Sequence, residues 1–106
     1  MTTANVEVAA HDGEIDIVVS GEIDLSNAES VQDDIFAAIT NHLVAVHIDL
    51  SKLTYIDSAG LRILFALADR LRLLQTRCRL SAPAGSPIQR VIELSGLASL
   101  VDVHLS

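Results

Sequence analysis

The sequence predicts an α/β fold, a small and mostly parallel sheet of four or five strands packed with three or more helices. One observation is the order of patterns: segments typical of strands alternate with segments whose apolar residues recur at helical spacing. A second is composition, since half of the 106 residues are hydrophobic, which suits a packed core. Strands separated by helices pair in parallel through right-handed crossovers, and residues 1–106 fit one domain.

A β-hairpin is predicted at the start of the chain. Residues 6–8 begin a first strand, and His11-Asp12-Gly13 is typical of a turn because Gly13 accepts a positive φ. In residues 14–20 apolar and polar side chains alternate, which indicates a strand with one buried face. Gly21-Glu22-Ile23-Asp24 is expected to end this second strand.

The first helix is predicted to follow directly. Ser26 is the expected N-cap, and Glu29, three residues later, would complete a capping box. Apolar residues then recur at helical spacing, and the helix is expected to stop near Asn41.

Two further strands flank a second helix. Residues 44–50 are apolar at nearly every position, as expected of a central parallel strand, and residues 51–56 are expected to be a connecting segment. A helix should begin at Asp57-Ser58-Ala59-Gly60, with apolar residues on one face up to Leu74. Leu80 belongs to the next short strand.

The C-terminal part carries clear signals for where a third helix begins and ends. Ser86 and Pro87 suit the N-cap and the first helical position. Gly96 suits the left-handed position after the helix, with Leu97 closing over its end. Val101 and Val103 indicate a final strand.

Charge and composition argue against several classes of protein. A net charge of −7 does not suit nucleic-acid binding, which needs clustered Lys and Arg. The charge is uneven, since residues 1–61 hold eleven acidic groups against Lys52 whereas residues 62–106 hold six Arg against three acidic groups. This asymmetry fits either an ordinary solvated surface or a bipolar one that orients a partner.

The absence of targeting segments and the few cysteine and histidine residues indicate where the protein acts and which groups it binds. No signal peptide or membrane-length apolar run is visible, so we expect a cytoplasmic protein without direct membrane insertion. Cys78 is alone and is expected to be a packed thiol, although flanking arginines would lower its pKa if it were exposed. The histidines lack partners at metal-ligand spacing, so neither a metal nor a cofactor is expected, and His47 is expected to be a satisfied core or edge residue.

The most informative segment is the start of the second helix. Asp57 or Ser58 can cap the free N–H groups of that helix, and capping alone is a sufficient explanation for both. Gly60 is less expected, because glycine costs about 1 kcal/mol relative to alanine inside a helix. A missing side chain there would let another backbone or a phosphate come close. Ile56 stands where a nucleophile elbow has glycine, so a serine hydrolase is disfavoured and an enzyme is not expected.

These residues resemble the signature of the STAS domains of bacterial anti-sigma factor antagonists. The matching features are a strand ending in Asp49-Leu50-Ser51, then Asp57-Ser58-Ala59-Gly60 followed by Leu61, and the earlier Gly21-Glu22-Ile23-Asp24-Leu25. The resemblance covers nearly the whole chain and implies a STAS-like fold. The family often has a second serine where this chain has Ala59, which leaves Ser58 as the only candidate in the motif.

The resemblance implies a regulated binding protein. In the family, the serine after the aspartate is phosphorylated by an anti-sigma factor that is also a serine kinase, and a serine phosphatase resets the modified form. The unphosphorylated protein captures the anti-sigma factor and frees the sigma factor. Carried over, Ser58 is the phosphorylation site, and the expected partner-binding residues lie around that serine: Asp24, Asp57, Ser58, Ala59, Gly60, Leu61 and Arg62. The sequence does not decide between a monomer and a weak homodimer.

Two alternatives stay open. A STAS domain also suits a subunit of a transport assembly or a sensor of a small ligand, and an intact Asp57-Ser58 does not distinguish these roles. Within the second helix, Ile63 and Leu67 either extend the partner-binding surface or pack into the core, because the helix has more apolar positions than one buried face needs.

Overall fold

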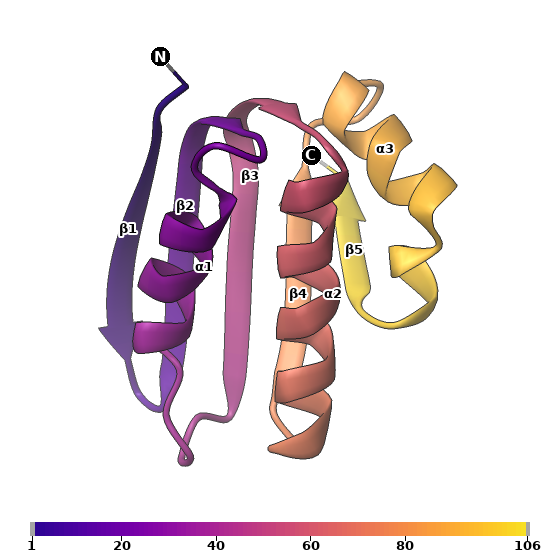
Figure 1. Ribbon diagram of the computed structural model, residues 1–106. Helices are drawn as coiled ribbons and strands as arrows, with labels where there is room; N and C mark the ends of the chain where they lie inside the picture. The colour runs from indigo at the N-terminus through magenta and orange to yellow at the C-terminus, as the bar shows by residue number, and fades with distance from the viewer. Residues whose placement is uncertain (1, 106) are drawn as a thin grey trace.

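The computed structural model describes residues 2–105 as one five-stranded sheet with three α-helices (Figure 1). Strand order follows the sequence, β1-β2-β3-β4-β5; the first pair is antiparallel and the other three are parallel. The predicted α/β class and the order of elements are confirmed. The elements are β1 (Ala4–His11), β2 (Glu14–Ile23), α1 (Ala28–Ala37), β3 (Ala45–Ile56), α2 (Ser58–Leu73), β4 (Arg77–Ala82), α3 (Pro87–Ser95), the short 3-10 helix η1 (Leu97–Ser99) and β5 (Asp102–Leu105).

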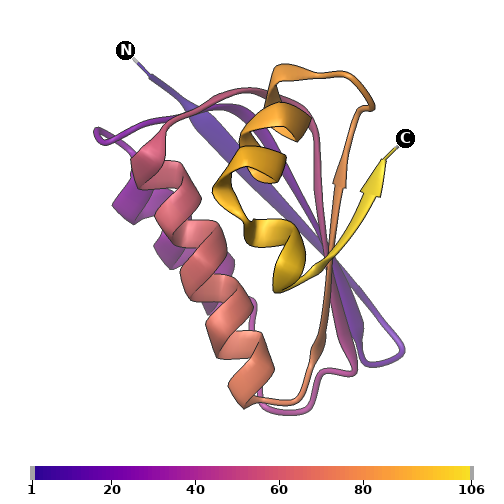
Figure 2. The ribbon, with the colours of Figure 1, turned by 90° about the vertical axis from the view of Figure 1, so that its right-hand side faces the viewer.

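The three helices cover only one face of the sheet (Figure 2). From β2 onwards each new strand is added on the same side of the previous one, so right-handed crossovers place every connecting helix on the same face. The core lies between that face and the helices. Its fully buried side chains include Ile17, Ile48 and Leu80 from the sheet and Ile35, Ile63, Leu67 and Ile92 from the helices. Ile63 and Leu67 therefore belong to the core and do not extend a partner surface.

The opposite face of the sheet carries no covering element within residues 2–105, and we call it the open face (Figure 2). It is formed by the side chains that alternate with the buried ones on each strand: Glu7, Glu14, Asp16, Val18, Ala45, His47, Asp49, Arg77, Arg79, Ser81, Asp102 and His104. The strands thus have one apolar and one polar face.

Strands β2 and β3 are both longer than the sequence suggested. Gly21–Ile23 continues β2, and residues 51–56 continue β3 instead of forming a connecting segment. The pairing shifts register between Val18 and Ser20 and again between Gly21 and Glu22. These irregularities change the spacing of buried positions on β3 from two to three, at Leu50, Leu53 and Ile56. The period-two pattern of a strand is therefore lost in the sequence although the pairing continues.

The predicted capping box at the start of α1 is wrong. The N-cap is Asn27, which makes no side-chain cap bond; its Oδ1 accepts from Asp24 N at 2.9 Å. Ser26 does not cap the helix either, because its hydroxyl donates to Asp24 Oδ1 at 2.5 Å. The helix also ends earlier than Asn41, at Ala37. The signals for α3 are confirmed: Ser86 Oγ accepts from Gln89 N at 3.1 Å, and Gly96 takes a left-handed φ of 83° with Leu97 buried.

Candidate functional site

The two strand-to-helix loops of interest leave the sheet side by side. In the parallel pair β2–β3, the last paired residues are Ile23 and Ile56. Asp24 follows Ile23 and Asp57 follows Ile56, so the two aspartates begin neighbouring loops. The Asp57 N–H donates to the Ile23 carbonyl at 3.2 Å and ties the two loops together. The carboxyl edge of a parallel sheet is where loops of open α/β folds assemble a site.

Asp57 is the N-cap of α2, which leaves Ser58 without a capping role. The Asp57 backbone is extended, and its Oδ1 accepts from Ala59 N at 2.9 Å and from Gly60 N at 3.2 Å. Ser58 is the first helical residue and is exposed, and within residues 2–105 its hydroxyl makes no side-chain hydrogen bond. Asp57 and Ser58, which the sequence offers equally as caps, therefore have different roles. Asp57 caps the helix, and Ser58 presents its hydroxyl to solvent.

Gly60 faces the protein interior. A Cβ built on Gly60 would lie 2.5 Å from Ile56 Cγ1 and 3.0 Å from Ile23 Cγ2, both side chains at the ends of the paired strands. The close approach expected at Gly60 is thus made by two core side chains and not by a backbone or a phosphate. The glycine lets the first turn of α2 sit directly on the sheet edge, which fixes the position of Ser58.

Asp24 is held by its own loop and by the N-terminal segment. Its carboxylate accepts hydrogen bonds from Ser26 Oγ at 2.5 Å, Thr2 Oγ1 at 2.7 Å and Ser26 N at 2.9 Å. These donors, the Ser26 hydroxyl first, lower the pKa of Asp24, so the group carries a negative charge at neutral pH. The Asp24 N–H donates to Asn27 Oδ1 at 2.9 Å, which makes the loop compact.

The seven residues predicted for partner binding lie in one region but differ in exposure. Ser58 and Arg62 are exposed, and Asp24, Asp57, Ala59 and Leu61 are half-buried, whereas Gly60 is buried beneath them. The sequence interpretation missed Leu25, whose side chain is 81% exposed beside Asp24. Its signal was a large apolar residue between two polar turn residues, where no helix or strand pattern would bury it. We call Asp24, Leu25, Asp57, Ser58 and Arg62 the Ser58 edge.

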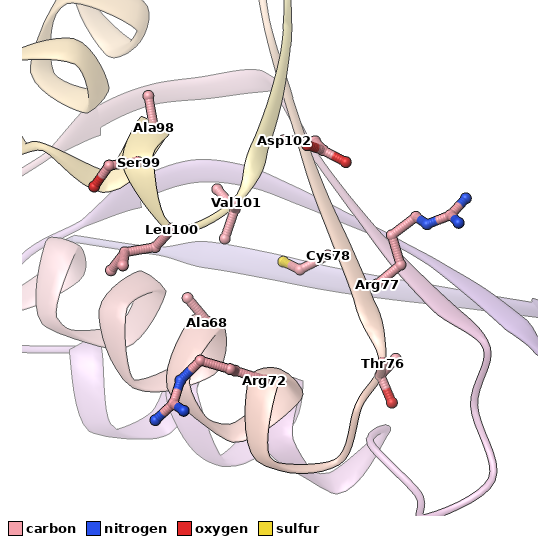
Figure 3. Close-up of a pocket in the computed structure, with 10 residues that line it drawn as sticks. All are labelled: Ala68, Arg72, Thr76, Arg77, Cys78, Ala98, Ser99, Leu100, Val101 and Asp102. Atoms are coloured by element: carbon pink, nitrogen blue, oxygen red, sulfur yellow. The ribbon is translucent and has the colours of Figure 1, made fainter.

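A separate hollow lies at the other end of α2, by the amino-terminal ends of β4 and β5 (Figure 3). It has a volume of about 370 Å³, and its lining includes Ala68, Cys78 and Leu100. Burial, with a smaller effect of Asp102, raises the pKa of the Cys78 thiol to about 11, so the flanking arginines do not activate it. The packed-thiol interpretation is the one the structure favours.

Metal clusters and membrane-length helices are both absent from residues 2–105. No group of three or more His, Cys, Asp or Glu side chains is arranged to hold a metal ion there. No helix in the same part of the chain has the length and apolar character needed to cross a membrane.

Comparisons with known proteins agree with this fold and place the chain in a family. The STAS domain family model matches residues 5–106. The anti-sigma-F factor antagonist RsfB of Mycobacterium tuberculosis is 34% identical over 92 residues, which cover 87% of this chain and 74% of RsfB. The crystal structure of an anti-sigma factor antagonist from Mycobacterium paratuberculosis superposes with a TM-score of 0.86 at 30% identity, covering 98% of this chain and 87% of that one.

A more distant structure shares the fold alone. SpoIIAA of Bacillus, an anti-sigma factor antagonist solved in its unphosphorylated form, has a TM-score of 0.76 at 19% identity, over 96% of this chain and 90% of its own. It has also been solved in the phosphorylated form. With a family model covering almost all of its length and relatives that are anti-sigma factor antagonists, this chain belongs to the STAS domain family.

Proposed function

We propose that this chain is an anti-sigma factor antagonist whose binding to an anti-sigma factor serine kinase is switched off by phosphorylation of Ser58. The observation that carries the proposal is the exposure of Ser58. Ser58 is the first residue of α2, and its hydroxyl is not needed as a cap because Asp57 caps the helix. A kinase can reach such a hydroxyl without unfolding the helix. The names of RsfB and of the M. paratuberculosis protein support the antagonist role.

The modification transfers a phosphoryl group from ATP to Ser58. The serine oxygen forms the new O–P bond, the bond between the β and γ phosphates of ATP breaks, and ADP leaves. The hydroxyl proton passes to a base of the kinase, so the catalytic groups belong to the partner. This chain supplies an acceptor hydroxyl and acts as a regulatory protein and not as an enzyme. A serine phosphatase would restore the hydroxyl by hydrolysis.

The effect on binding is electrostatic. Phosphoserine carries about −1.5 to −2 charges at pH 7, and the N-terminus of α2 tolerates this charge, so the domain stays folded. The charge is added beside Asp57 and at the edge shared with Asp24, whose carboxylate is already ionised. A partner packed over this edge must desolvate it. A penalty of about 3 kcal/mol, on the scale of an unpaired buried charge, weakens binding about 100-fold.

The proposed contact surface is the Ser58 edge together with Ala59, Leu61 and the buried Gly60 that supports them. Leu25 gives it an apolar side chain that is 81% exposed, next to the Asp24 carboxylate. An exposed leucine between polar residues suits a protein partner, because buried apolar contacts surrounded by polar groups are typical of protein interfaces.

Substitution of Ser58 tests the proposal. Affinity capture from the native lysate would supply the kinase. Ser58→Ala should take up no phosphate and still bind it, since Asp57 keeps the helix cap, whereas Ser58→Asp should bind more weakly but by less than true phosphorylation. Mass spectrometry measures phosphate incorporation and calorimetry measures affinity.

The control is Ser51→Ala, which removes another exposed hydroxyl from the second half of β3. It should be phosphorylated on Ser58 and bind like the natural protein. Phosphate on Ser51 or Thr54 of the Ser58→Ala variant, at wild-type stoichiometry, would contradict the assignment. Capture of a transporter ATPase in place of a kinase would favour the alternative role in a transport assembly.

A further inference from the structure

The open face of the sheet is unusual for this topology. Strands β2 to β5 are parallel, and parallel sheets generally have both faces covered, yet the helices leave this face bare (Figure 2). The charged side chains on this face are also not mixed at random, because acidic and basic residues lie on different strands. The acidic side chains Glu14 and Asp16 lie on β2, and the basic side chains Arg77 and Arg79 lie on β4.

The register aligns these charges in rows across the sheet. Glu14 pairs with Ala45, which pairs with Arg77, and the next row runs from Asp16 through His47 to Arg79. In each row β3 lies between an acid and an arginine, and neither Glu14–Arg77 nor Asp16–Arg79 forms a salt bridge within one molecule. The shortness of the Ala45 side chain leaves a hollow of about 250 Å³ between Glu14 and Arg77.

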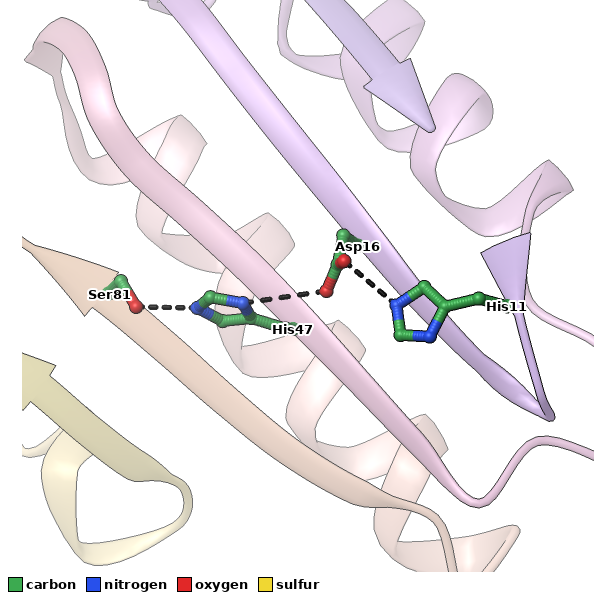
Figure 4. Close-up of polar contacts among 4 residues, drawn as sticks. All are labelled: His11, Asp16, His47 and Ser81. Atoms are coloured by element: carbon green, nitrogen blue, oxygen red, sulfur yellow. Dashed lines mark hydrogen bonds and ion pairs between the residues drawn. The ribbon is translucent and has the colours of Figure 1, made fainter. Parts of the chain in front are cut away.

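Only part of this charge is satisfied within the chain. Asp16 contacts His11 at 3.0 Å and His47 at 3.5 Å, and His47 in turn is hydrogen-bonded to Ser81 (Figure 4). Glu14, Arg77 and Arg79 have no salt-bridge partner among residues 2–105. One acid and two arginines, all three exposed, are thus available on the open face.

We propose that the open face binds a second copy of this chain, related by a two-fold axis that runs along β3. Rotation about this axis places β2 of one copy over β4 of the other with the rows in register. Glu14 then faces the other copy's Arg77, Asp16 faces its Arg79, and each contact occurs twice, as in any isologous dimer. The outer strands also match, because Glu7 of β1 falls opposite His104 of β5, two residues of the same row. An axis perpendicular to the strands would instead put acid on acid.

The expected dimer is weak and leaves the Ser58 edge available. Five strands spaced about 4.8 Å apart, over the five positions at which β3 pairs with β4, give roughly 400 Å² per copy. This is about half of what a standard interface takes from each partner. The axis also brings the two Asp49 carboxylates together, so Asp49→Asn should tighten the dimer. Because α2 covers the other face of the sheet, the proposal does not rest on the function proposed for Ser58.

Complementary charge reversal tests the arrangement. Glu14→Arg puts two arginine pairs into the homodimer, and Arg77→Glu puts in two acidic pairs, so each variant alone should dimerise at least about tenfold more weakly than the natural chain. Mixed in equal amounts, the two variants should form a heterodimer. The arginine introduced at position 14 of one chain then faces the glutamate introduced at position 77 of the other, and the two unchanged residues, Arg77 and Glu14, face each other. Sedimentation equilibrium up to about 1 mM protein at low salt measures the dissociation constants of the natural homodimer, the two variant homodimers and the heterodimer.

Two variants with the same charge changes on the helices, Glu29→Arg and Arg90→Glu, control for the effect of net charge. Each should dimerise like the natural chain, and so should their mixture. Neither residue forms a salt bridge or side-chain hydrogen bond within residues 2–105. A natural chain that is monomeric at 1 mM overturns the proposal, and so does a mixture of Glu14→Arg and Arg77→Glu that fails to associate. Circular dichroism establishes that each variant is folded before mixing.

Discussion

Asp57 and Ser58 are neighbours with similar capping ability, and their different roles arise from one backbone conformation. The extended Asp57 directs its carboxylate back to the N–H groups of Ala59 and Gly60, while Ser58 is already helical and exposed. The sequence alone predicts a helix start here but cannot say which residue caps it. That choice depends on the Asp57 N–H bonding to Ile23, a residue 34 positions earlier in the chain.

Gly60→Ala tests how tightly α2 is seated. In an exposed helix this change would stabilise by about 1 kcal/mol, but here the added Cβ would lie 2.5 Å from Ile56 Cγ1. Overpacking of this kind typically costs about 1–3 kcal/mol, so we expect a net loss of unfolding free energy in urea titrations. In an Ile56→Ala background the loss should shrink or reverse, because Cγ1 and Cδ1 of Ile56 are gone and only Ile23 Cγ2, at 3.0 Å, remains close to the added Cβ. A stabilised Gly60→Ala single variant would contradict the close packing.

At two residues the outcome depended on groups that lie far away in the sequence. The Ser26 cap was lost because the Asp24 carboxylate takes the hydroxyl, in a loop that Thr2 also holds. Cys78 is the packed thiol that was expected, and the alternative of activation by its arginines is not favoured, because the thiol lies on the helix-covered face while Arg77 and Arg79 lie on the open one. Local sequence identifies the candidate partners, but the fold decides between them.

Strands and helices whose apolar residues recur at a regular spacing could be predicted from the sequence, and a strand with irregular spacing could not. The alternation in residues 14–20 and the cap signals of α3 match the structure directly. The second half of β3 escaped prediction because the register shifts opposite Val18–Glu22 place buried residues three apart. A bulged strand has neither the strand nor the helix period, so its pattern resembles a loop.

The β1–β2 hairpin should show a pH-dependent stability through His11. Its hydrogen bond with Asp16, aided by the charges of Asp16, Glu14 and Asp12, raises the pKa of His11 in the folded state. A raised folded-state pKa adds stability that is fully present below the unfolded pKa of about 6.5 and is lost as the pH rises through the folded value. His11→Gln should therefore lower the urea midpoint at pH 5.5 and leave it unchanged at pH 9.

His42→Gln is the matched control, because His42 lies in the loop after α1 and forms no ion pair within residues 2–105. Its effect should be the same at both pH values. An equal loss for His11→Gln at pH 5.5 and pH 9 would show that His11 contributes through packing and not through its charge.

For the whole molecule, the order of elements was enough to predict the layered fold, since alternating strands and helices with right-handed crossovers allow few arrangements. The same order explains why one face stays open, because each new strand is added on the same side. What the sequence did not reveal is the sorting of acids onto β2 and arginines onto β4. The two groups lie about 60 residues apart, and only the register brings them into common rows.

The one-sided architecture makes a direct prediction for two adjacent valines on β2. Val19 is 1% exposed and faces the helices, whereas Val18 faces the open side. Val19→Ala removes buried methyl groups and leaves a cavity, so it should cost about 2–3 kcal/mol. Val18→Ala should cost less than about 1 kcal/mol, mainly through lower strand propensity. Urea unfolding at low micromolar concentration, where the proposed dimer is dissociated, measures both. Equal losses of unfolding free energy for the two variants would mean that Val18 is as buried as Val19 in the monomer. That result would contradict a sheet with only one covered face.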